Sequence, residues 1–229
     1  MVLILTNDDG IDAPGIQALQ KAVKDRGIMV APQGQLSGCG HQVTTSKSFV
    51  VEKRSPKEYA VTGTPADCTR VATFQLYPND IDWVLSGINT GGNLGVDVYI
   101  SGTVAAVREA AIHNIPAIAI SHWIKRPWVI DWEIATKWTA MVLDKLFALP
   151  LPPKAFWNVN LPHLEPGADT PEIVFCPLSC DPLPLNYEIE GDRYSYRGKY
   201  PDRPRAAGTD VDLCFNGNIV VTQLTVGNG

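Results

Sequence analysis

Segments typical of β-strands and segments typical of helices alternate through the first two-thirds of the chain. The strand-like segments are short apolar runs bounded by turn residues, and the helix-like segments carry apolar residues at helical spacing. This order favours a mainly parallel sheet with helices on both faces, because neighbouring parallel strands need a crossover connection. The predicted strands are 2–6, 28–31, 44–53, 59–62, 83–86, 117–121, 156–161 and 218–226. The predicted helices are 14–24, 103–113, 131–149 and one that begins at Thr64-Pro65, an N-cap followed by proline.

Residues 162–208 have a different character from the rest of the chain. The segment is rich in proline, and residues 193–205 combine five basic side chains with three tyrosines. Such a segment has little apolar area with which to hold a fold of its own. We therefore expect an arm that is ordered against a partner subunit or covers the active site. The chain is interpreted as a single domain, with an α/β core over 1–161 and a C-terminal arm and returning strand over 162–229.

Composition narrows the class of protein. The 229 residues carry a net charge of −5 at pH 7, which argues against a nucleic-acid polymer as the main partner. No apolar run approaches the roughly 20 residues of a membrane span, and the N-terminus has no basic leader. We therefore expect a cytoplasmic protein without membrane contact. The five cysteines have neither a disulfide framework nor a complete zinc-binding pattern, so reduced thiols are expected.

Two adjacent aspartates stand at the carboxyl end of the first predicted strand, in the sequence Asn7-Asp8-Asp9-Gly10. Ligands of open α/β sheets bind at this edge. Aspartates are rarely buried unless they are paired or bound to a cation, so a doublet at this position predicts a cation site. The simpler alternative is that one of the two caps the following helix, a role for which a single acid suffices.

Three further loops are dense in small residues that carry oxygen, and they span residues 35–41, 86–95 and 101–104. Loops at the carboxyl ends of parallel strands gather at one edge of the sheet. Carboxylate, hydroxyl and amide oxygens suit Mg²⁺ or Mn²⁺ better than zinc. A carboxylate and a phosphate oxygen about 4 Å apart repel by roughly 4 kcal/mol per charge pair. We therefore expect one divalent metal ion that makes an acidic site compatible with a phosphate group.

Two of these loops have the features of a phosphate-binding site. Glycines such as Gly91 let backbone N–H groups approach an anion, and Ser101-Gly102-Thr103 adds hydroxyls and the positive end of a helix. Ordinary turns are the alternative, because the same residue types dominate turns. His41 is either a general acid for the leaving group or a hydrogen-bonded structural residue. The sequence motifs of α/β-hydrolases, P-loop proteins and dinucleotide-binding domains do not occur.

Six separated motifs lie in order along the first half of the chain. They occupy residues 4–11, 31–32 with 37–38, 62–68, 86–93, 101–106 and 115–121. Together these motifs resemble the SurE family of survival proteins, which are metal-dependent 5′/3′-nucleotidases. Two positions depart from the family pattern: Glu109-Ala110 stands where the family has Glu-Gly, and Thr222-Gln223-Leu224 stands where it has Thr-Pro-Leu. Near the C-terminus, Gly208-Thr209-Asp210 resembles a further element of the family.

The resemblance implies a three-layer α/β domain of Rossmann-like character that forms homodimers or homotetramers through a C-terminal extension. The family's metal-ligand positions fall on Asp8, Asp9, Ser37 and Asn89. The positions that line the phosphate pocket fall on Asn93, Ser101, Gly102 and Thr103, and we include Asn7 and Gly91 in the same predicted pocket.

The residues of the site predict the hydrolysis of a phosphate monoester. The resemblance implies that the substrate is a nucleoside monophosphate and that the products are nucleoside and phosphate. Asp8 and Asp9 are the predicted catalytic residues, as metal ligands or as the group that positions the water. One alternative is a phosphoaspartyl phosphatase in which Asp8 is the nucleophile. Another is a nucleotide sensor that binds without turnover. The choice among 5′-nucleotides, 3′-nucleotides and short polyphosphate, an exopolyphosphatase substrate, stays open.

Overall fold

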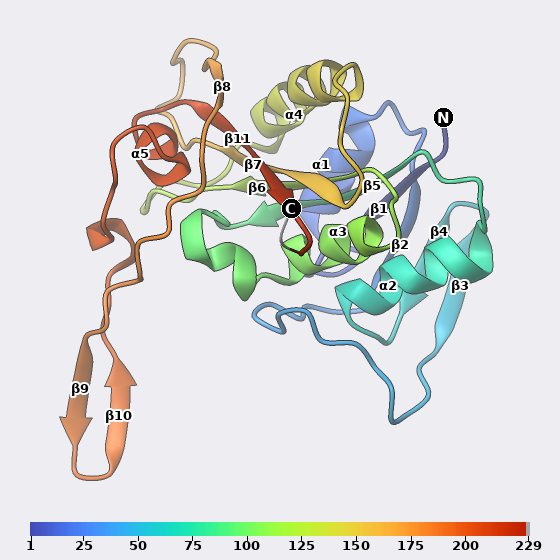
Figure 1. Cartoon of the computed structure of the whole chain (residues 1–229), viewed down its shortest axis with the longest axis horizontal. Coiled ribbons are helices and arrows are strands. Elements are labelled where there is room, and N and C mark those ends of the chain that lie inside the picture. Colours follow the sequence, from blue (N-terminus) through green and yellow to red (C-terminus); the bar gives the residue numbers. More distant parts are fainter. Residues whose placement is uncertain (228–229) are drawn as a thin grey trace.

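A mainly parallel β-sheet forms the centre of the molecule. Its strands are β1 (Leu3–Thr6), β2 (Ile28–Pro32), β3 (Val51–Ser55), β4 (Glu58–Val61), β5 (Trp83–Thr90), β6 (Ala117–His122), β7 (Ala155–Leu161), β8 (Ile173–Phe175) and β11 (Ile219–Thr225). In the computed structural model, which describes residues 1–227, these nine strands follow the order β3-β4-β2-β1-β5-β6-β7-β11-β8 (Figure 1). The strands from β4 to β7 pair in parallel, while β3 and β11 run antiparallel to β4 and β7.

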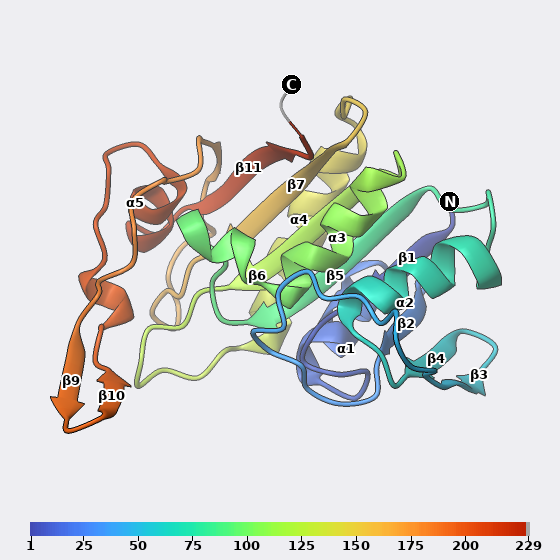
Figure 2. The same ribbon diagram turned by 60° about the horizontal axis from the view of Figure 1, so that its bottom comes forward.

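Helices cover both faces of this sheet. They are α1 (Pro14–Ala22), α2 (Pro65–Val71), α3 (Gly102–Ile112), α4 (Trp132–Phe147) and, near the C-terminus, α5 (Asp210–Phe215). α1 and α4 pack together on one face, and α2 and α3 pack together on the other (Figure 2). Leu3 and Leu5 of β1 join the core under α1 and α4, while Ile4 joins the core under α2 and α3, because successive strand residues point to opposite faces. The predicted three-layer Rossmann-like α/β fold is confirmed.

Local capping residues set where the helices begin. Thr64 and Asp67 form a capping box at α2: Asp67 N donates to Thr64 Oγ1 at 3.1 Å, and Thr64 N donates to Asp67 Oδ2 at 2.9 Å. Ser101 caps α3 and Asp131 caps α4 through bonds to backbone N–H groups of the first turn. None of the helices within residues 1–227 has both the length and the apolar character that crossing a membrane requires.

The predicted strand over 44–53 is wrong for its first part, because β3 begins only at Val51. The reason lies in the contacts of Thr44, whose N and Oγ1 donate to the Asp67 carboxylate at 2.9 and 2.6 Å. These bonds tie the segment to α2 instead of to a neighbouring strand. Residues 44–50 therefore form an irregular connection near the carboxyl edge of the sheet.

β5 is longer than predicted. The sequence analysis ends this strand at residue 86, whereas the structure continues it to Thr90 with a register shift against β6 between Ser86 and Asn89. Polar and glycine residues in this stretch are typical of turns, which concealed the continuation. The extension carries Asn89 and Thr90 to the carboxyl edge of the sheet.

The C-terminal arm contains more regular structure than predicted. β8 adds to the edge of the sheet beside β11, and a hairpin of β9 (Tyr187–Glu190) and β10 (Arg193–Tyr196) extends away from the body (Figure 1). The hairpin and α5 were not predicted from the sequence. Both elements are too short for a periodic apolar pattern to reveal them.

Candidate active site

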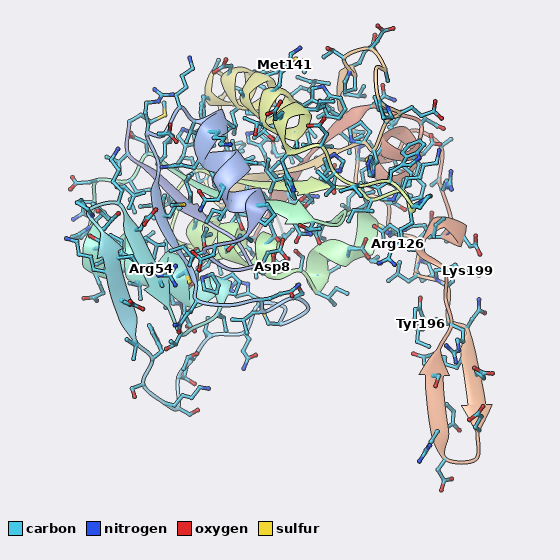
Figure 3. All side chains as sticks on the ribbon, turned by 180° about the vertical axis from the view of Figure 1, so that it is seen from behind. Asp8, Arg54, Arg126, Met141, Tyr196 and Lys199 are labelled. Atoms are coloured by element: carbon cyan, nitrogen blue, oxygen red, sulfur yellow. The ribbon has the colours of Figure 1, made fainter. Side chains whose placement is uncertain are left out.

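Polar groups from several loops meet at the carboxyl edge of the sheet, beside the N-terminus of α3. Asp8 and Asp9 follow β1, Asn89 and Thr90 end β5, and Thr103 lies in the first turn of α3. Figure 3 shows Asp8 near the middle of the body, well away from the hairpin. β1 and β5 are adjacent parallel strands, so the polar residues at their carboxyl ends lie close together at the same edge of the sheet.

Asp8 is an almost fully buried carboxylate with 4% of its surface exposed. Its Oδ1 accepts a hydrogen bond from Thr103 Oγ1 at 2.5 Å. Burial raises the pKa of Asp8, the bond from Thr103 lowers it, and the charge of Asp9 raises it further. Within the described residues no cationic side chain offsets the cost of burial. A carboxylate in such a setting is stabilised by a bound cation.

Gly102 lets α3 approach Asp8 closely. A Cβ atom added at Gly102 would lie 2.9 Å from Asp8 Cβ, which is closer than real Cβ atoms approach, and 3.2 Å from Cys39 Sγ. The Ser101 hydroxyl caps the helix, and the backbone N–H of Thr103 faces the Asp8 carboxylate, whereas Gly102 N has no acceptor within residues 1–227. The positive end of the helix therefore lies directly beside the buried carboxylate.

Asp9 connects the doublet to the end of β5. Asp9 is half-buried, and its Oδ2 accepts a hydrogen bond from Thr90 N at 3.1 Å. Asn89 Nδ2 donates to Gly91 O at 2.7 Å. The side-chain oxygen of Asn89 takes no part in this bond and is available to a ligand. The structure thus brings the doublet next to the segment that carries Asn89, with no apolar core between them.

The loop after β2 lies against the doublet. Leu36 N donates to Asp8 O at 2.7 Å, which fixes this loop to the backbone of Asp8. Ser37 is exposed in the same loop, and its Oγ accepts a bond from Gln35 Nε2 at 3.0 Å. Burial and the nearby charge of Asp8 raise the pKa of the Cys39 thiol, so this thiol stays protonated at neutral pH.

The donor set of the site consists of oxygen atoms. Among residues 1–227 no group of three or more His, Cys, Asp and Glu side chains is arranged to hold a metal ion. Two carboxylates with a hydroxyl and an amide oxygen form a smaller set, of the kind that Mg²⁺ completes with water and substrate oxygens. The buried, uncompensated carboxylate of Asp8 and the close approach at Gly102 fit such an ion.

Two residues of the predicted phosphate pocket form hydrogen bonds within the protein that stabilise their loops. Asn7 closes the turn of the doublet: its Nδ2 donates to Gly10 O at 2.7 Å, and its Oδ1 accepts from Gly10 N at 3.2 Å. Gly91 N donates to His122 O at 3.0 Å. Direct phosphate contacts from Asn7 and Gly91 stay predictions, and the structure shows their polar groups bonded to protein instead.

Asn93 is held by three residues that the sequence analysis missed. Its N donates to Asn160 Oδ1 and its Nδ2 to Ser121 Oγ, both at 2.8 Å, and its carbonyl oxygen accepts from Asn158 Nδ2 at 2.9 Å. All four side chains are buried. Asn158 and Asn160 stand in an otherwise apolar strand, and this was the signal that could have revealed them.

A buried ionic cluster centred on Glu109 lies behind the predicted site. Glu109 Oε2 is 2.7 Å from His41 Nε2, and Oε1 is 2.7 Å from Arg70 Nε and 3.1 Å from His113 Nε2. Burial alone would raise the pKa of Glu109, but the three hydrogen bonds together lower it to about 2. His41 thus binds Glu109 of α3 and anchors the loop that follows Ser37, which matches the structural alternative for this histidine.

Glu109→Gln is expected to lower the free energy of unfolding at pH 7 by about 2 kcal/mol, because an amide cannot replace the buried carboxylate as acceptor for three donors. The pKa of Glu109 in the folded protein is about 2, below its ordinary value of 4.5. The ionised carboxylate therefore contributes its full stabilisation at pH values above 4.5. This advantage over the variant should shrink as the pH falls from 4.5 towards 2. Urea unfolding across this range measures it, with the exposed Glu190→Gln as control. A difference that does not change with pH would contradict the role of the charge.

The C-terminal extension holds the segment that leads into α3. Arg203 is 1% exposed as a side chain, and it donates from Nη1 to Asp97 Oδ2 at 2.7 Å and from Nη2 to Leu94 O at 3.0 Å. Tyr200 Oη donates to the same carboxylate oxygen at 2.6 Å. The backbone oxygen of Asp97 accepts from Ser101 N at 3.1 Å. Residues after the hairpin therefore hold the segment that leads into α3.

A mainly parallel α/β sheet with a buried aspartate against a helix N-terminus at its carboxyl edge defines a Rossmann-like protein. Comparison with known families identifies the family within this class to which the chain belongs. The chain belongs to the survival protein SurE family, whose sequence pattern matches residues 3–180. The resemblance carried by the six motifs is confirmed.

Individual relatives agree with this assignment. The chain is 59% identical over 227 residues to the Nostoc sp. protein alr3139, whose name marks it provisionally as a 5′-nucleotidase, and 99% of this chain and 100% of that protein are covered. It is 42% identical over 242 residues to the 5′-nucleotidase SurE of Heliobacterium modesticaldum, with 98% and 86% covered. The crystal structure of the SurE protein from Aquifex aeolicus superposes with a TM-score of 0.87 at 31% identity, covering 100% of this chain and 95% of that chain.

Proposed function

We propose that this protein is a metal-dependent 5′-nucleotidase that hydrolyses nucleoside monophosphates to nucleoside and phosphate. The observation that carries the proposal is the buried Asp8 carboxylate in contact with the free N-terminus of α3. A cation that offsets the charge of Asp8 and an anion bound by the helix fit next to each other there. The names of the relatives support the choice of nucleotides as substrate.

Asp8, Asp9, Ser37 and Asn89 would hold Mg²⁺ or Mn²⁺. When bound, such an ion polarises a phosphoryl oxygen and lowers the pKa of a coordinated water. Thr103 orients Asp8 by its hydrogen bond, and Thr90 N orients Asp9.

The N-terminus of α3 is the group that binds the phosphoryl oxygens. Gly102 N is free of protein acceptors within the described chain, and the helix dipole adds positive potential. Its orientation is set before substrate arrives, because Ser101 caps the helix and Arg203 holds the preceding segment. Donors fixed in advance stabilise the charge that develops as the ester bond breaks.

Assembly into homodimers or homotetramers stays a prediction. The hairpin of β9 and β10 supports it, because this hairpin lies away from the body (Figure 3) and exposes large apolar side chains. Among these are Tyr187, Ile189, Tyr194 and Tyr196. Exposed aromatic and aliphatic groups on an extended element fit contact with a second copy of the chain.

The proposed activity is tested by phosphate release from 5′-AMP, 5′-GMP, 3′-AMP and short polyphosphate in the presence of Mn²⁺ or Mg²⁺. We expect turnover of 5′-nucleotides that falls by roughly a hundredfold when EDTA removes the metal and returns when Mn²⁺ is added back. A phosphodiester serves as the control substrate and should not be hydrolysed. Tight, metal-dependent nucleotide binding without phosphate release would contradict the proposal and support a sensor.

A further inference from the structure

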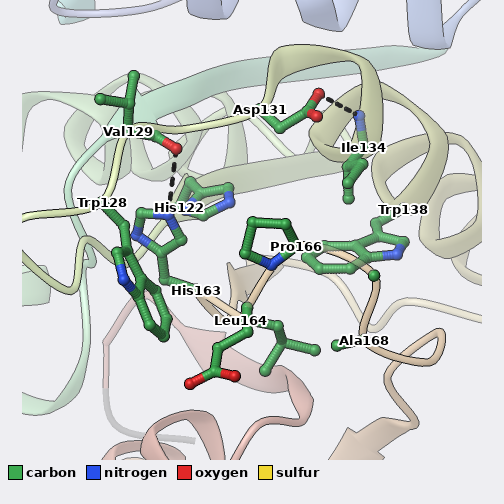
Figure 4. A pocket seen from close by; sticks show the side chains of 12 residues that line it. His122, Trp128, Val129, Asp131, Ile134, Trp138, His163, Leu164, Pro166 and Ala168 are labelled. Carbon is green, nitrogen blue, oxygen red and sulfur yellow. Dashed lines mark hydrogen bonds between the residues drawn. The ribbon is translucent and has the colours of Figure 1, made fainter.

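A cavity of about 360 Å³ lies at the carboxyl ends of β6 and β7, on the sheet face that α4 covers (Figure 4). Its walls include Trp128, Trp138, His122, His163 and Leu164, with Asp131 at the N-cap of α4. His122 is the last residue of β6, and His163 follows the end of β7. The cavity therefore opens at the same edge of the sheet as the aspartate doublet. Its volume is in the range of small-molecule sites.

Aromatic rings dominate the lining. The rings of His122 and His163 are 5.1 Å apart and nearly perpendicular, and the ring of Trp128 lies 5.5 Å from that of His163. Figure 4 shows Trp128 and the two histidines on one side, with Trp138 on the other side beyond Pro166. Faces and edges of this kind bind planar aromatic groups.

Both histidines are neutral, and their hydrogen bonds define which nitrogen carries the proton. His163 Nδ1 accepts from Lys125 N at 3.0 Å, so its Nε2 carries the proton and donates to Val129 O at 3.3 Å. His122 Nδ1 donates to Trp123 O at 2.7 Å, so its Nε2 is an acceptor, and it has no partner within residues 1–227. Burial lowers the pKa of His122 to about 4 and also lowers the pKa of His163.

The negative charge of the cavity lining disfavours the phosphate of a nucleotide and favours an uncharged part of it. Asp131 and the exposed Glu165 place carboxylates at this cavity, and these would repel a phosphate. An uncharged ring that carries N–H donors meets no such penalty. Its donors would face the acceptor Nε2 of His122 and the carboxylate of Asp131, while its faces meet aromatic side chains.

The cavity lies close to Asp9, which belongs to the proposed metal and phosphate site. Thr90 N donates to Asp9 Oδ2 at 3.1 Å, and Thr90 pairs in register with His122 on the adjacent strand. Gly91 N also donates to His122 O at 3.0 Å. Adjacent strands lie roughly 5 Å apart, so one strand spacing separates the backbone beside Asp9 from the backbone of the cavity wall. Thr90 is exposed and lies between Asp9 and His122, so it marks the boundary between the two places.

We propose that this cavity is the subsite for the base of the nucleotide, with Trp128 stacking on a purine and His122 Nε2 accepting a hydrogen bond from its amino edge. The proposal rests on the proposed nucleotidase function, since it places the phosphate at Asp8 and α3 and lets the ribose cross the boundary at Thr90. A purine is favoured over a pyrimidine because its larger face covers more of the aromatic wall.

The test compares substrates with and without a base in the variant Trp128→Ala. We expect kcat/KM for 5′-AMP and 5′-GMP to fall about tenfold, mostly through a higher KM, because loss of a stacking partner weakens base binding. Hydrolysis of ribose 5-phosphate, which has the same phosphate monoester and no base, should stay unchanged. Trp128→Phe should restore most of the loss. Trp132→Ala, a tryptophan outside the cavity lining, is the matched control. Equal losses for nucleotides and ribose 5-phosphate, or no loss for either, would overturn the proposal.

A binding measurement separates this proposal from the nucleotidase activity itself. Adenosine and guanosine titrated into metal-free protein should change the fluorescence of the wild type, and Trp128→Ala should abolish or strongly weaken that binding. If the wild type hydrolyses no phosphomonoester yet binds these nucleosides through Trp128, the activity fails and the base subsite stands. If the nucleosides bind equally to both proteins, or to neither, the base subsite is rejected whatever the activity.

Discussion

Replacing Asp8 with asparagine is expected to reduce kcat/KM for metal-dependent phosphate release from 5′-AMP by roughly a thousandfold, which corresponds to about 4 kcal/mol of transition-state stabilisation. Asparagine has nearly the same shape, and its side-chain oxygen can accept the bond that Thr103 donates to Asp8 Oδ1. It lacks the negative charge that attracts a divalent cation. The substitution therefore removes the charge of the site and leaves the contacts around it in place.

The same variant is expected to keep or raise the thermal stability of the metal-free protein. Burial raises the pKa of Asp8, which shows that the charged form is disfavoured in the folded state without a cation. An amide avoids that cost. Thermal unfolding in EDTA measures the effect. A lost activity together with an unchanged or higher Tm would exclude unfolding as the cause.

Asp12→Asn is the matched control for this prediction. Asp12 follows the doublet closely in sequence, but its side chain is 75% exposed and pairs with Arg54 at the surface. Its substitution should leave kcat/KM within about twofold of the wild type. If Asp8→Asn kept activity within tenfold of the wild type, the metal site would be refuted. A phosphorylated Asp8 trapped in quenched wild-type reactions and seen by mass spectrometry would favour the phosphoaspartyl alternative.

Arg203→Ala is expected to lower the free energy of unfolding by about 3–5 kcal/mol, because it leaves a buried carboxylate without its ion pair. Asp97 would keep only the hydrogen bond from Tyr200, and Leu94 O would lose its donor. The guanidinium is 1% exposed, so water cannot replace it without rearrangement. Urea unfolding at neutral pH provides the measurement.

Two comparisons separate the ion pair from general damage to the C-terminal extension. Arg205→Ala removes an exposed guanidinium that donates to Pro201 O, and it should cost less than about 1 kcal/mol. The double variant Arg203→Ala with Asp97→Asn should be more stable than Arg203→Ala alone, because no unpaired charge is left. A double variant less stable than the single one would show that the lost charge pair is not the cause.

Much of the site's position followed from local sequence patterns. The strand before Asp8, the cap at Thr64 and the helix start at Ser101-Gly102-Thr103 were predicted because each signal involves residues within a few positions of one another. Local patterns misled at 44–50, where Thr44 binds Asp67, a residue 23 positions away. They also ended β5 too early, because pairing with β6 outweighs the turn tendency of its glycines.

The hydrogen-bonding partners of the polar residues were outside the reach of sequence patterns. Asn93 was predicted to line the phosphate pocket, yet its polar groups are bonded to Ser121, Asn158 and Asn160 from two other strands. Glu109 was noted in the sequence only as the neighbour of Ala110, where the chain departs from a family motif, and in the structure it is the centre of an ionic cluster. Such pairings depend on which helices and strands become neighbours, and short-range spacing carries little information about that.

Residue types at short, regular spacing were enough to predict the parallel α/β sheet and the oxygen-rich donors at one of its edges. Which of these donors are bonded to protein depends on the assembled structure. Thr103 is hydrogen-bonded to Asp8, Gly102 N has no acceptor within the described residues, and a cavity lies between Trp128 and Trp138. Burial and hydrogen bonding of each group arise from contacts between elements far apart in the chain, and those contacts exist only once the sheet has assembled.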